Sequence, residues 1–588
     1  MGKFIKVIVT FYLVTSTHLS AETFLDKVVV TPLKKPTKIF DAFNNVQVIT
    51  SKDIKLQGYK SINEILSRSS SISIGSNGGY GQTKSIFLRG TESNHTKVLV
   101  NGVNLNPGTL GVPSIQHISV DMVESIEISK GSMSTLYGKD TIGGVINIIT
   151  KKNQDNQISI SRGTHNTNNF VYSGGFNHLN HNFSTNLSRL ESDSYEAKVN
   201  STKNHKYDTT NLDLNYAMSI GYNEISTNYY QSTGNTEYDS FGSNLNQNHK
   251  DSHLKFNINH IFTKSHIDFF YIKKTNEINQ AAPSATDYTH TKVNALGLEY
   301  IFTRNELDHI LFGFDYSDEA MYELSYGTSF KHTNKIKQAY VSSTYSATNI
   351  LQTNFGIRLQ NHSTYNNFTS GNIGINYYPH PKLVLSTALA KSFRAPDATD
   401  LFGYGGNSNL TPEESKTSEI SLRYRISDDE SFAGTFFHNR ITNLIESDGT
   451  KMQNINKAEI TGIDISYTRY VNDTKYDIQY TYQEPKDKTN NVILSRRPRS
   501  RMIGNVTHFF KNAESVSITT TYESRRDNSI YDTNQLGGYF LVDVNYLKNV
   551  HGYEIGFKID NLLDKNYRLA HNYNTGGRSF NFSIKSNF

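Results

Sequence analysis

Four glycines fall within seven residues, at Gly75, Gly78, Gly79 and Gly81. Glycine tolerates positive φ angles and lets another backbone or a ligand approach closely. A plain hairpin loop would use the same residues, so the pattern alone does not choose between a turn and a contact site. The sequence offers no Ser–His–Asp triad, paired-carboxylate site or phosphate-binding loop, which makes an enzyme the least favoured class.

A valine-rich stretch is the second feature with a chemical use. It reads Asp26-Lys27-Val28-Val29-Val30-Thr31-Pro32-Leu33. An exposed strand of this kind can pair with the sheet edge of a partner through main-chain hydrogen bonds. Pro32 would end the pairing because it has no N–H. A run of this composition is by itself more often a buried strand, but its place ahead of the first folded domain favours the exposed strand.

The composition separates the possible protein classes. The 588 residues include no Cys and no Trp, but 37 Tyr and 32 Phe. Without Cys there is no disulfide framework and no thiolate metal site. Aromatic residues reach 12% while the hydrophobic fraction is only 36%, which suits a membrane barrel, where only every second strand residue meets lipid. The net charge of +5 gives no reason to expect nucleic acid as a partner.

The first 21 residues have the pattern of a signal peptide. Lys3 and Lys6 form a basic start, residues 7–14 are an apolar run, and Ser20 and Ala21 stand near the predicted cleavage point. A buried helix is the alternative. No other stretch approaches the ~18 apolar residues that a spanning helix needs, so an exported chain of this kind is either soluble or a barrel.

The remaining chain divides into two parts with different residue patterns. Residues 38–152 mix short strands, such as 46–49 and 145–149, with a helix that opens at Ser51, and this mixture predicts a small α+β domain. After about residue 155, apolar and polar residues alternate, as in 212–220, 254–260 and 580–588. Polar stretches at 242–248 and 366–372 are expected to break the chain between strands.

Alternating strands with one polar and one apolar face indicate a transmembrane sheet. Open sheet edges cannot lie in lipid, so such strands must close into a barrel. About 430 residues at roughly 20 per strand give on the order of 20–22 strands, and a barrel that wide has room for a folded plug. A soluble propeller or solenoid is the alternative, although no blade-length repeat is visible.

The most specific motifs lie in the N-terminal domain. They run from Asn77 to Gly90, from Asn94 to Asn106, from Lys130 to Ser132, from Leu136 to Gly138 and from Ile142 to Thr150. This series strongly resembles the plug of TonB-dependent receptors, and most closely that of the outer-membrane cobalamin receptors. The family usually has Asp-Gly where this chain has Asn101-Gly102.

Motifs in the C-terminal part resemble the barrel of the same family. They are Ser392-Phe393-Arg394-Ala395-Pro396, the stretch from Gly406 to Glu413, the stretch from Asn561 to Tyr567, Gly577-Arg578 and the terminal Phe588. The resemblance therefore covers essentially the whole chain after the signal peptide.

The resemblance implies an architecture and a location. It implies an all-β membrane protein, a 22-stranded antiparallel transmembrane β-barrel with an N-terminal α+β plug domain inside. Residues 1–21 would be the signal peptide, 22–37 the TonB box and linker, 38–152 the plug and 155–588 the barrel. The protein would be a monomer among the lipids of a Gram-negative outer membrane. It would be a transporter and not an enzyme.

The resemblance also assigns site residues. Asp26, Lys27, Val28, Val29, Val30, Thr31 and Pro32 would form the TonB box, whose partner is TonB with its inner-membrane energising complex. Residues matching the family's ligand contacts are Thr83, Ser85, Glu92, Leu110 and Gly111 in the plug, with Arg496 and Tyr531 in the barrel. Thr83 and Glu92 replace the usual Leu and Asn of the family.

Cobalamin is the expected ligand, ahead of haem, with a ferric siderophore third. A large, mostly neutral corrin suits small polar and backbone contacts, whereas a negatively charged siderophore would favour the Arg and Lys residues that the ligand loops lack. Haem receptors usually carry a histidine between the two barrel motifs, and residues 393–410 contain none. His95 is a conceivable haem ligand, but a structural histidine is favoured.

No cofactor or metal is predicted, with calcium the one candidate. Cobalamin receptors bind calcium through acidic loops, and the corresponding stretch here is 193–208, with Glu196 and Asp208 as the nearest carboxylates. Calcium needs six or more oxygen ligands, mostly from clustered carboxylates, and this stretch does not supply such a cluster.

Overall fold

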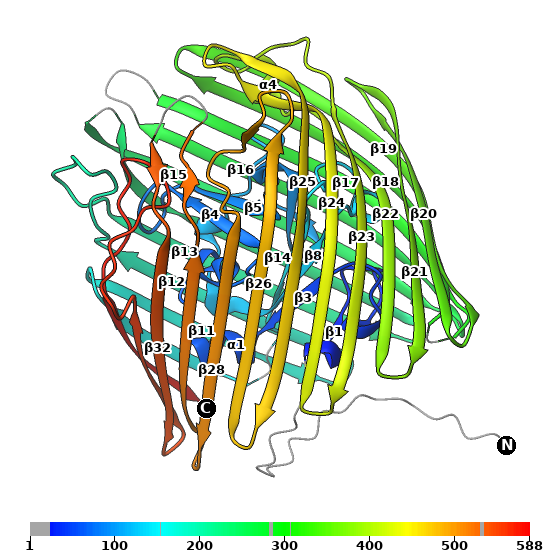
Figure 1. Ribbon diagram of the computed structural model, residues 1–588, viewed down its shortest axis with the longest axis horizontal. Helices are drawn as coiled ribbons and strands as arrows, with labels where there is room; N and C mark the ends of the chain where they lie inside the picture. The colour runs from blue at the N-terminus through cyan, green and yellow to red at the C-terminus, as the bar shows by residue number, and fades with distance from the viewer. Residues whose placement is uncertain (1–23, 153–154, 241, 282–285, 306, 530–533) are drawn as a thin grey trace.

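The computed structural model describes residues 24–152, 155–240, 242–281, 286–305, 307–529 and 534–588. The predicted signal peptide lies outside the described residues. The described chain forms one closed barrel with the N-terminal domain, drawn in blue, inside it (Figure 1). None of its helices has the length and apolarity needed to cross a membrane.

The barrel has 22 strands in the described residues, each antiparallel to its neighbours. The predicted architecture is therefore confirmed. The last strand pairs with the first, with Ile160 opposite Ile584, so no sheet edge is left open. The strands are β10 (Gln157–Gly163), β11 (Thr167–His178), β12 (His181–Ser192), β13 (Tyr207–Ile220), β14 (Asn223–Ser240), β15 (Ser243–Ile261), β16 (Ser265–Ala281), β17 (Thr286–Thr303), β18 (His309–Ser325), β19 (Thr328–Thr348), β20 (Leu351–His362), β21 (Asn366–His380), β22 (Leu383–Arg394), β23 (Glu413–Ser427), β24 (Glu430–Ser447), β25 (Met452–Val471), β26 (Thr474–Asp487), β28 (Ser500–Phe510), β29 (Glu514–Glu523), β32 (Tyr539–Val550), β33 (Tyr553–Asp560) and β34 (Ser579–Asn587). 

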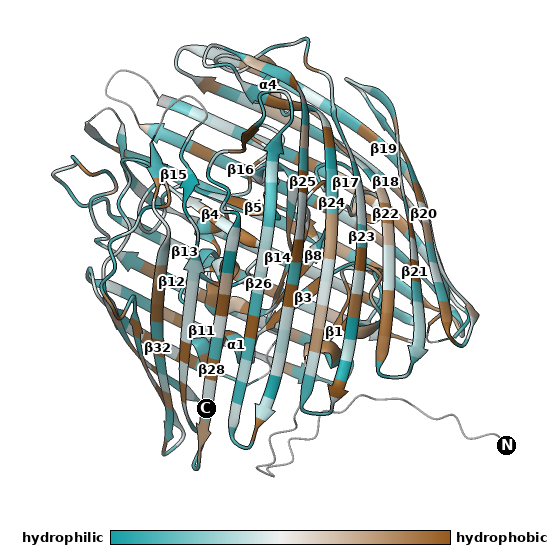
Figure 2. Ribbon diagram, viewed as in Figure 1, coloured by the Kyte–Doolittle hydropathy of each residue, from teal (hydrophilic) through white to brown (hydrophobic). Residues whose placement is uncertain are grey.

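Side chains alternate between the lumen and the outside of the barrel. In β13, Asn211 and Asp213 are fully buried against the interior, while Tyr216 is 38% exposed on the outer face. Hydrophilic and hydrophobic residues interchange along the strands accordingly (Figure 2). This alternation is what a wall between lipid and a filled lumen requires.

The expected break at residues 242–248 is correct only for Gly242, which lies between β14 and β15, and the expected break at 366–372 is wrong. Residues 243–248 open β15, and 366–372 open β21. Crossing the hydrocarbon takes only about 9–11 tilted strand residues, whereas β19 has 21. The polar stretches are strand extensions that project beyond the lipid, so polarity there does not end the strand.

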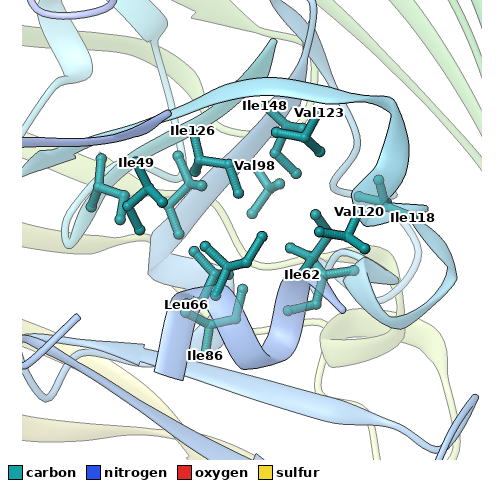
Figure 3. Packing of buried hydrophobic residues seen from close by; sticks show 14 of the residues in the cluster. Ile49, Ile62, Leu66, Ile86, Val98, Ile118, Val120, Val123, Ile126 and Ile148 are labelled. Carbon is teal, nitrogen blue, oxygen red and sulfur yellow. The ribbon is translucent and has the colours of Figure 1, made fainter. Parts of the chain in front are cut away.

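The plug is a mixed five-stranded sheet covered by short helices. Its sheet has the order β3-β8-β9-β6-β7, and a separate hairpin pairs β4 with β5. Its core includes Ile49, Leu66, Ile86, Val98 and Ile126 (Figure 3). The elements are β3 (Val46–Thr50), α1 (Ser51–Gln57), α2 (Ile62–Ser67), β4 (Ile72–Ser76), β5 (Lys84–Leu88), β6 (Thr96–Val100), β7 (Val103–Asn104), β8 (Val123–Lys130), α3 (Ser134–Tyr137) and β9 (Gly144–Thr150).

Helix α1 begins at Ser51, where the sequence predicts it. Thr50 caps it: its hydroxyl accepts a hydrogen bond from the Asp53 N–H, and the Asp53 carboxylate accepts one from the Thr50 N–H. Such a reciprocal box satisfies amide donors that the first helical turn leaves free. The helix ends at Gln57 and is followed by Gly58, whose φ of 63° suits a left-handed C-cap.

Candidate functional site

The two ends of the barrel differ in their connections. At one end the strands are joined by short turns, such as 179–180 and 551–552, and the C-terminus lies there together with β1 (Val28–Val29) (Figure 1). At the other end the connections are longer, including 193–206, 395–412 and 561–578. Long loops face outside and short turns face the periplasm in barrels of this kind.

The glycine-rich loop, residues 77–83, lies at the long-loop end. It connects β4 to β5 and packs against the barrel loop 193–206 and the start of β13. A Cβ atom at Gly79 would lie 2.2 Å from the Ser194 Oγ, and one at Gly81 would lie 2.2 Å from the Tyr207 ring. Gly81 also has a φ of 72°. The glycines are therefore required both by backbone conformation and by close contact with the barrel wall.

Lys84 supports this loop from beneath. Its ammonium donates to the carbonyl oxygens of Gly78 at 2.6 Å and Gly79 at 3.0 Å, and also to the Ser76 hydroxyl. Burial lowers the pKa of Lys84 to about 7. Lys84 is the only Lys or Arg among the described residues of this loop and β5. Its buried ammonium thus points into the plug and away from the outer surface.

A second plug loop, residues 107–113, docks on the barrel. The N–H groups of Ala398 and Thr399, in the long loop after β22, donate to the carbonyl oxygens of Gly108 and Thr109 at 2.9 and 3.0 Å. The Asn106 side-chain amide donates to the Gly111 carbonyl at 2.9 Å and fixes the turn. This loop is consequently held between the plug core and α4 (Ala398–Phe402).

The predicted ligand residues occupy these outer loops and the plug between them. Thr83 is exposed, whereas Ser85, Leu110 and Gly111 are half-buried. The Asn94 Cβ lies 3.1 Å from the position a Gly111 side chain would take, and the Ser93 hydroxyl accepts from the Ile86 N–H at 2.8 Å. The loop around residue 92 therefore bridges β5 and the 107–113 loop. Their role in ligand binding stays a prediction.

Glu92 is engaged by the barrel. Its carboxylate forms an ion pair with Arg497, whose guanidinium also stacks 4.5 Å above the Phe87 ring. The neighbouring Arg496, which the family match assigns to the ligand, is half-buried with a φ of 62°, and its N–H donates to the Asp527 carbonyl at 2.7 Å. The structure thus joins the plug to the 488–499 loop through Arg497. Tyr531 lies outside the described residues.

His95 is fully buried between the plug and the wall. Its Nδ1 accepts a hydrogen bond from the Glu92 N–H at 3.2 Å, and its Nε2 contacts the Glu413 carboxylate. Both ring nitrogens therefore have protein partners. This arrangement agrees with a structural histidine.

Two of the three carboxylates in the candidate calcium stretch, Asp193 and Asp208, are paired with cations, and the third is Glu196. Asp208 lies 3.0 Å from Arg189, and Asp193 lies 3.8 Å from Lys206. The donors present there do not form the cluster of free acidic oxygens that calcium requires.

The valine-rich segment, residues 26–32, lies at the opposite, short-turn end and is docked. Val28 and Val29 form a short strand, β1, paired with β2 (Thr37–Lys38). Val28 is 55% exposed, but Val29 is fully buried in an apolar cluster that includes Phe40 and, from the wall, Val384. The structure therefore differs from the freely exposed strand that the sequence favours: alternate residues pack against the plug.

Glu127 of β8 holds the end of this segment. Its carboxylate accepts from the Val30 N–H at 3.0 and 3.1 Å and from the Thr31 N–H at 2.7 Å. The Tyr137 hydroxyl donates to the Thr31 carbonyl at 3.0 Å. A buried carboxylate thus takes two amide donors that an added strand from a partner could otherwise use.

Replacing Glu127 with Gln is expected to release the segment. A hydrogen bond to a charged group contributes roughly 1.5–3 kcal/mol, so the released fraction should rise roughly tenfold or more. Because the chain has no Cys, a spin label on Val28→Cys reports mobility at one site. Glu124→Gln, on the exposed edge of the same strand, is the matched control and should leave the spectrum unchanged; equal spectra for both variants would contradict this role of Glu127.

Comparison with family models gives two matches that together span most of the chain. The TonB-dependent receptor plug domain matches residues 38–145. The TonB-dependent receptor-like β-barrel matches residues 148–570.

Curated proteins and solved structures give full-length relatives. The chain is 27% identical to the vitamin B12 transporter BtuB of Vibrio vulnificus strain YJ016, covering 94% of this chain and 93% of that protein. It is 26% identical to BtuB of Photobacterium profundum, covering 94% of each. Among solved structures, the ferric enterobactin receptor PfeA of Pseudomonas aeruginosa superposes with a TM-score of 0.83 at 16% identity, covering 96% of this chain and 100% of that one. The siderophore receptor PirA of Acinetobacter baumannii has a TM-score of 0.81 at 17% identity, covering 92% and 98%. At these identities the structural likeness shows the shared fold.

Proposed function

The chain belongs to the TonB-dependent receptors, and on that premise we propose that it carries cobalamin across the outer membrane into the periplasm. Members of this family are transporters of the Gram-negative outer membrane and not enzymes. Our proposal concerns the substrate, the residues that bind it and the segment that pairs with TonB.

The lack of charge on the outer plug loops carries the substrate proposal. Residues 77–83 and 107–113 contain no Lys, Arg, Asp or Glu, and the nearby Lys84 is turned inward onto the loop carbonyls. Desolvating a multiply charged ferric siderophore without cationic partners would be costly, whereas a large neutral ligand suits backbone and small polar contacts. The curated relatives are vitamin B12 transporters, which supports the same choice.

Haem is the second candidate, and the environment of His95 weighs against it. A haem ligand must offer a free imidazole nitrogen to the iron. Both nitrogens of His95 have partners, and the side chain is fully buried.

We propose that residues 26–32 are the TonB box and that the ligand contacts are Thr83, Ser85, Glu92, Leu110, Gly111, Arg496 and Tyr531. The described members of the ligand set lie at the outer end, and the proposed TonB box lies at the periplasmic end. Release of the docked β1 strand would allow it to pair with the sheet edge of TonB. TonB would then pull on the N-terminal end of the plug.

Titrating the purified protein with cyanocobalamin, haem and a ferric catecholate tests the substrate. We expect nanomolar binding of cyanocobalamin, about −12 kcal/mol, and at least about a hundredfold weaker binding of the other two. Leu110→Asp places a charge on the uncharged loop and should weaken cyanocobalamin binding, while Leu179→Asp, on an exposed periplasmic turn, should not. Tight haem or siderophore binding without cobalamin binding would overturn the substrate and leave the family unchanged.

A further inference from the structure

The outer wall of the barrel carries an uneven distribution of charge. On β15 to β19, the outward face has six exposed lysines, which are Lys250, Lys273, Lys292, Lys331, Lys335 and Lys337. The same face carries two carboxylates, Glu277 and Asp318, which are only half-exposed. None of the six lysines forms an ion pair with a described carboxylate, although Lys331 lies 5.4 Å above the Tyr322 ring. This face, the lysine patch, is therefore cationic and largely unpaired.

The strand register places the lysines next to one another. Lys273 is opposite Asn294, Asn294 is opposite Asp318, and Asp318 is opposite Lys335, so the two lysines share one cross-strand row. Lys337 follows two positions along β19 on the same face. Neighbouring strands are about 4.8 Å apart, so long lysine side chains from this row can reach a common multivalent anion.

An apolar groove begins directly below the patch, toward the periplasm. It has a volume of about 420 Å³ and runs along β19, where small Ala339 is flanked in register by Phe314 and Leu359. Phe312 and Val341 continue it. Phe312, Phe314 and Leu359 are 48–57% exposed on the outer face. The wall thus carries the lysine patch on the side of the long loops and, next to it, the apolar groove between bulky side chains.

The part of the wall formed by β22 to β25 differs. Two outward cations on β22 to β25 have carboxylate partners: Lys391 lies 3.1 Å from Glu414, and Arg440 lies 4.0 Å from Glu459. A cation that already has a carboxylate partner has less to gain from an external anion. The excess of outward cations without a carboxylate partner is therefore larger on the β15–β19 wall.

We propose that the β15–β19 wall binds a phosphate-bearing, acylated lipid of the outer leaflet. The lysine patch holds the anionic headgroup, and an acyl chain lies in the groove along β19. Charge complementarity selects the headgroup, and the adjoining groove requires that the anion carry a hydrocarbon chain. The lysines stand on the side of the apolar belt that faces the long loops, so the lipid belongs to the outer leaflet.

Native mass spectrometry of the intact, delipidated receptor in detergent tests the site. The probes are bis-phosphorylated lipid A, its dephosphorylated form and inorganic phosphate. Each lysine near a membrane strengthens the binding of anionic lipid about fivefold, so the triple variant Lys273→Gln, Lys335→Gln, Lys337→Gln should weaken lipid A binding roughly 100-fold. Dephosphorylated lipid A should bind the wild type as weakly, and inorganic phosphate alone should not be retained.

Two further variants separate the groove from the charge and from general effects on the barrel. Ala339→Trp fills the groove without changing the charge and should also weaken lipid A binding. The control Lys391→Gln, Lys416→Gln, Arg440→Gln removes three outward cations from β22–β24 and should bind like the wild type. The proposal is overturned if the patch variant binds as tightly as the control, or if phosphorylated and dephosphorylated lipid bind alike. Heat-modifiable migration of every variant verifies that the barrel is folded.

Discussion

Val29→Pro is expected to reduce uptake of labelled cyanocobalamin to background, while binding at the cell surface stays within about twofold of wild type. Val29 lies at the centre of the proposed TonB box and is paired in β1 with β2. Proline removes one strand N–H and fixes φ near −65°. The released segment would then lack a hydrogen bond on the edge that TonB must use, so no force would reach the plug.

Val29→Ala separates pairing from packing. Val29 is fully buried in the cluster with Phe40 and Val384, so both substitutions remove the buried side chain, but only proline removes the N–H. The alanine variant should retain most of its uptake. Equal loss in both variants would assign the effect to packing, and normal uptake by Val29→Pro would show that residues 26–32 are not the coupling strand.

The barrel could be predicted because the residue pattern that indicates it lies within each strand. Alternation along a strand such as β13 follows directly from having lipid on one side and a filled lumen on the other. The strand ends could not be predicted in the same way. Residues 243–248 look like a loop because they are polar, but beyond the lipid a strand may be polar on both faces.

The docking of the proposed TonB box had no signal in the sequence. Val30 and Thr31 bind Glu127, which is nearly one hundred residues away, and Val29 packs against Val384 of the wall. These contacts depend on the relative placement of plug and barrel. The same holds for Glu92, whose partner is Arg497: the motif around 495–499 indicates a basic loop but does not determine which arginine reaches the plug.

Arg89 is the residue whose loss should most weaken the attachment of the plug to the barrel. Its guanidinium lies 2.8 Å from Asp464 on β25 and 2.7 Å from Glu419 on β23, and it stacks 4.3 Å above the Phe437 ring. All three charged side chains are at most 5% exposed. One buried plug cation, Arg89, therefore binds two strands of the wall, β23 and β25.

Arg89→Met is expected to destabilise the seated plug by about 3–5 kcal/mol, because it leaves two buried carboxylates without their main partner. Amide hydrogen exchange in β5 and β9 should accelerate by two orders of magnitude or more, and cells should become sensitive to large antibiotics that the plug excludes.

Lys130→Met is the matched control: Lys130 is also a buried plug cation, but it lies 3.9 Å from Asp464 and leaves Arg89 in place to neutralise that carboxylate. Its effect should be several-fold smaller. If the two variants exchange alike, the attachment must be shared among other plug–wall contacts, such as Arg68 with Asp543 or Lys558 with Glu64, and the Arg89 triad would be one ion-pair group among several.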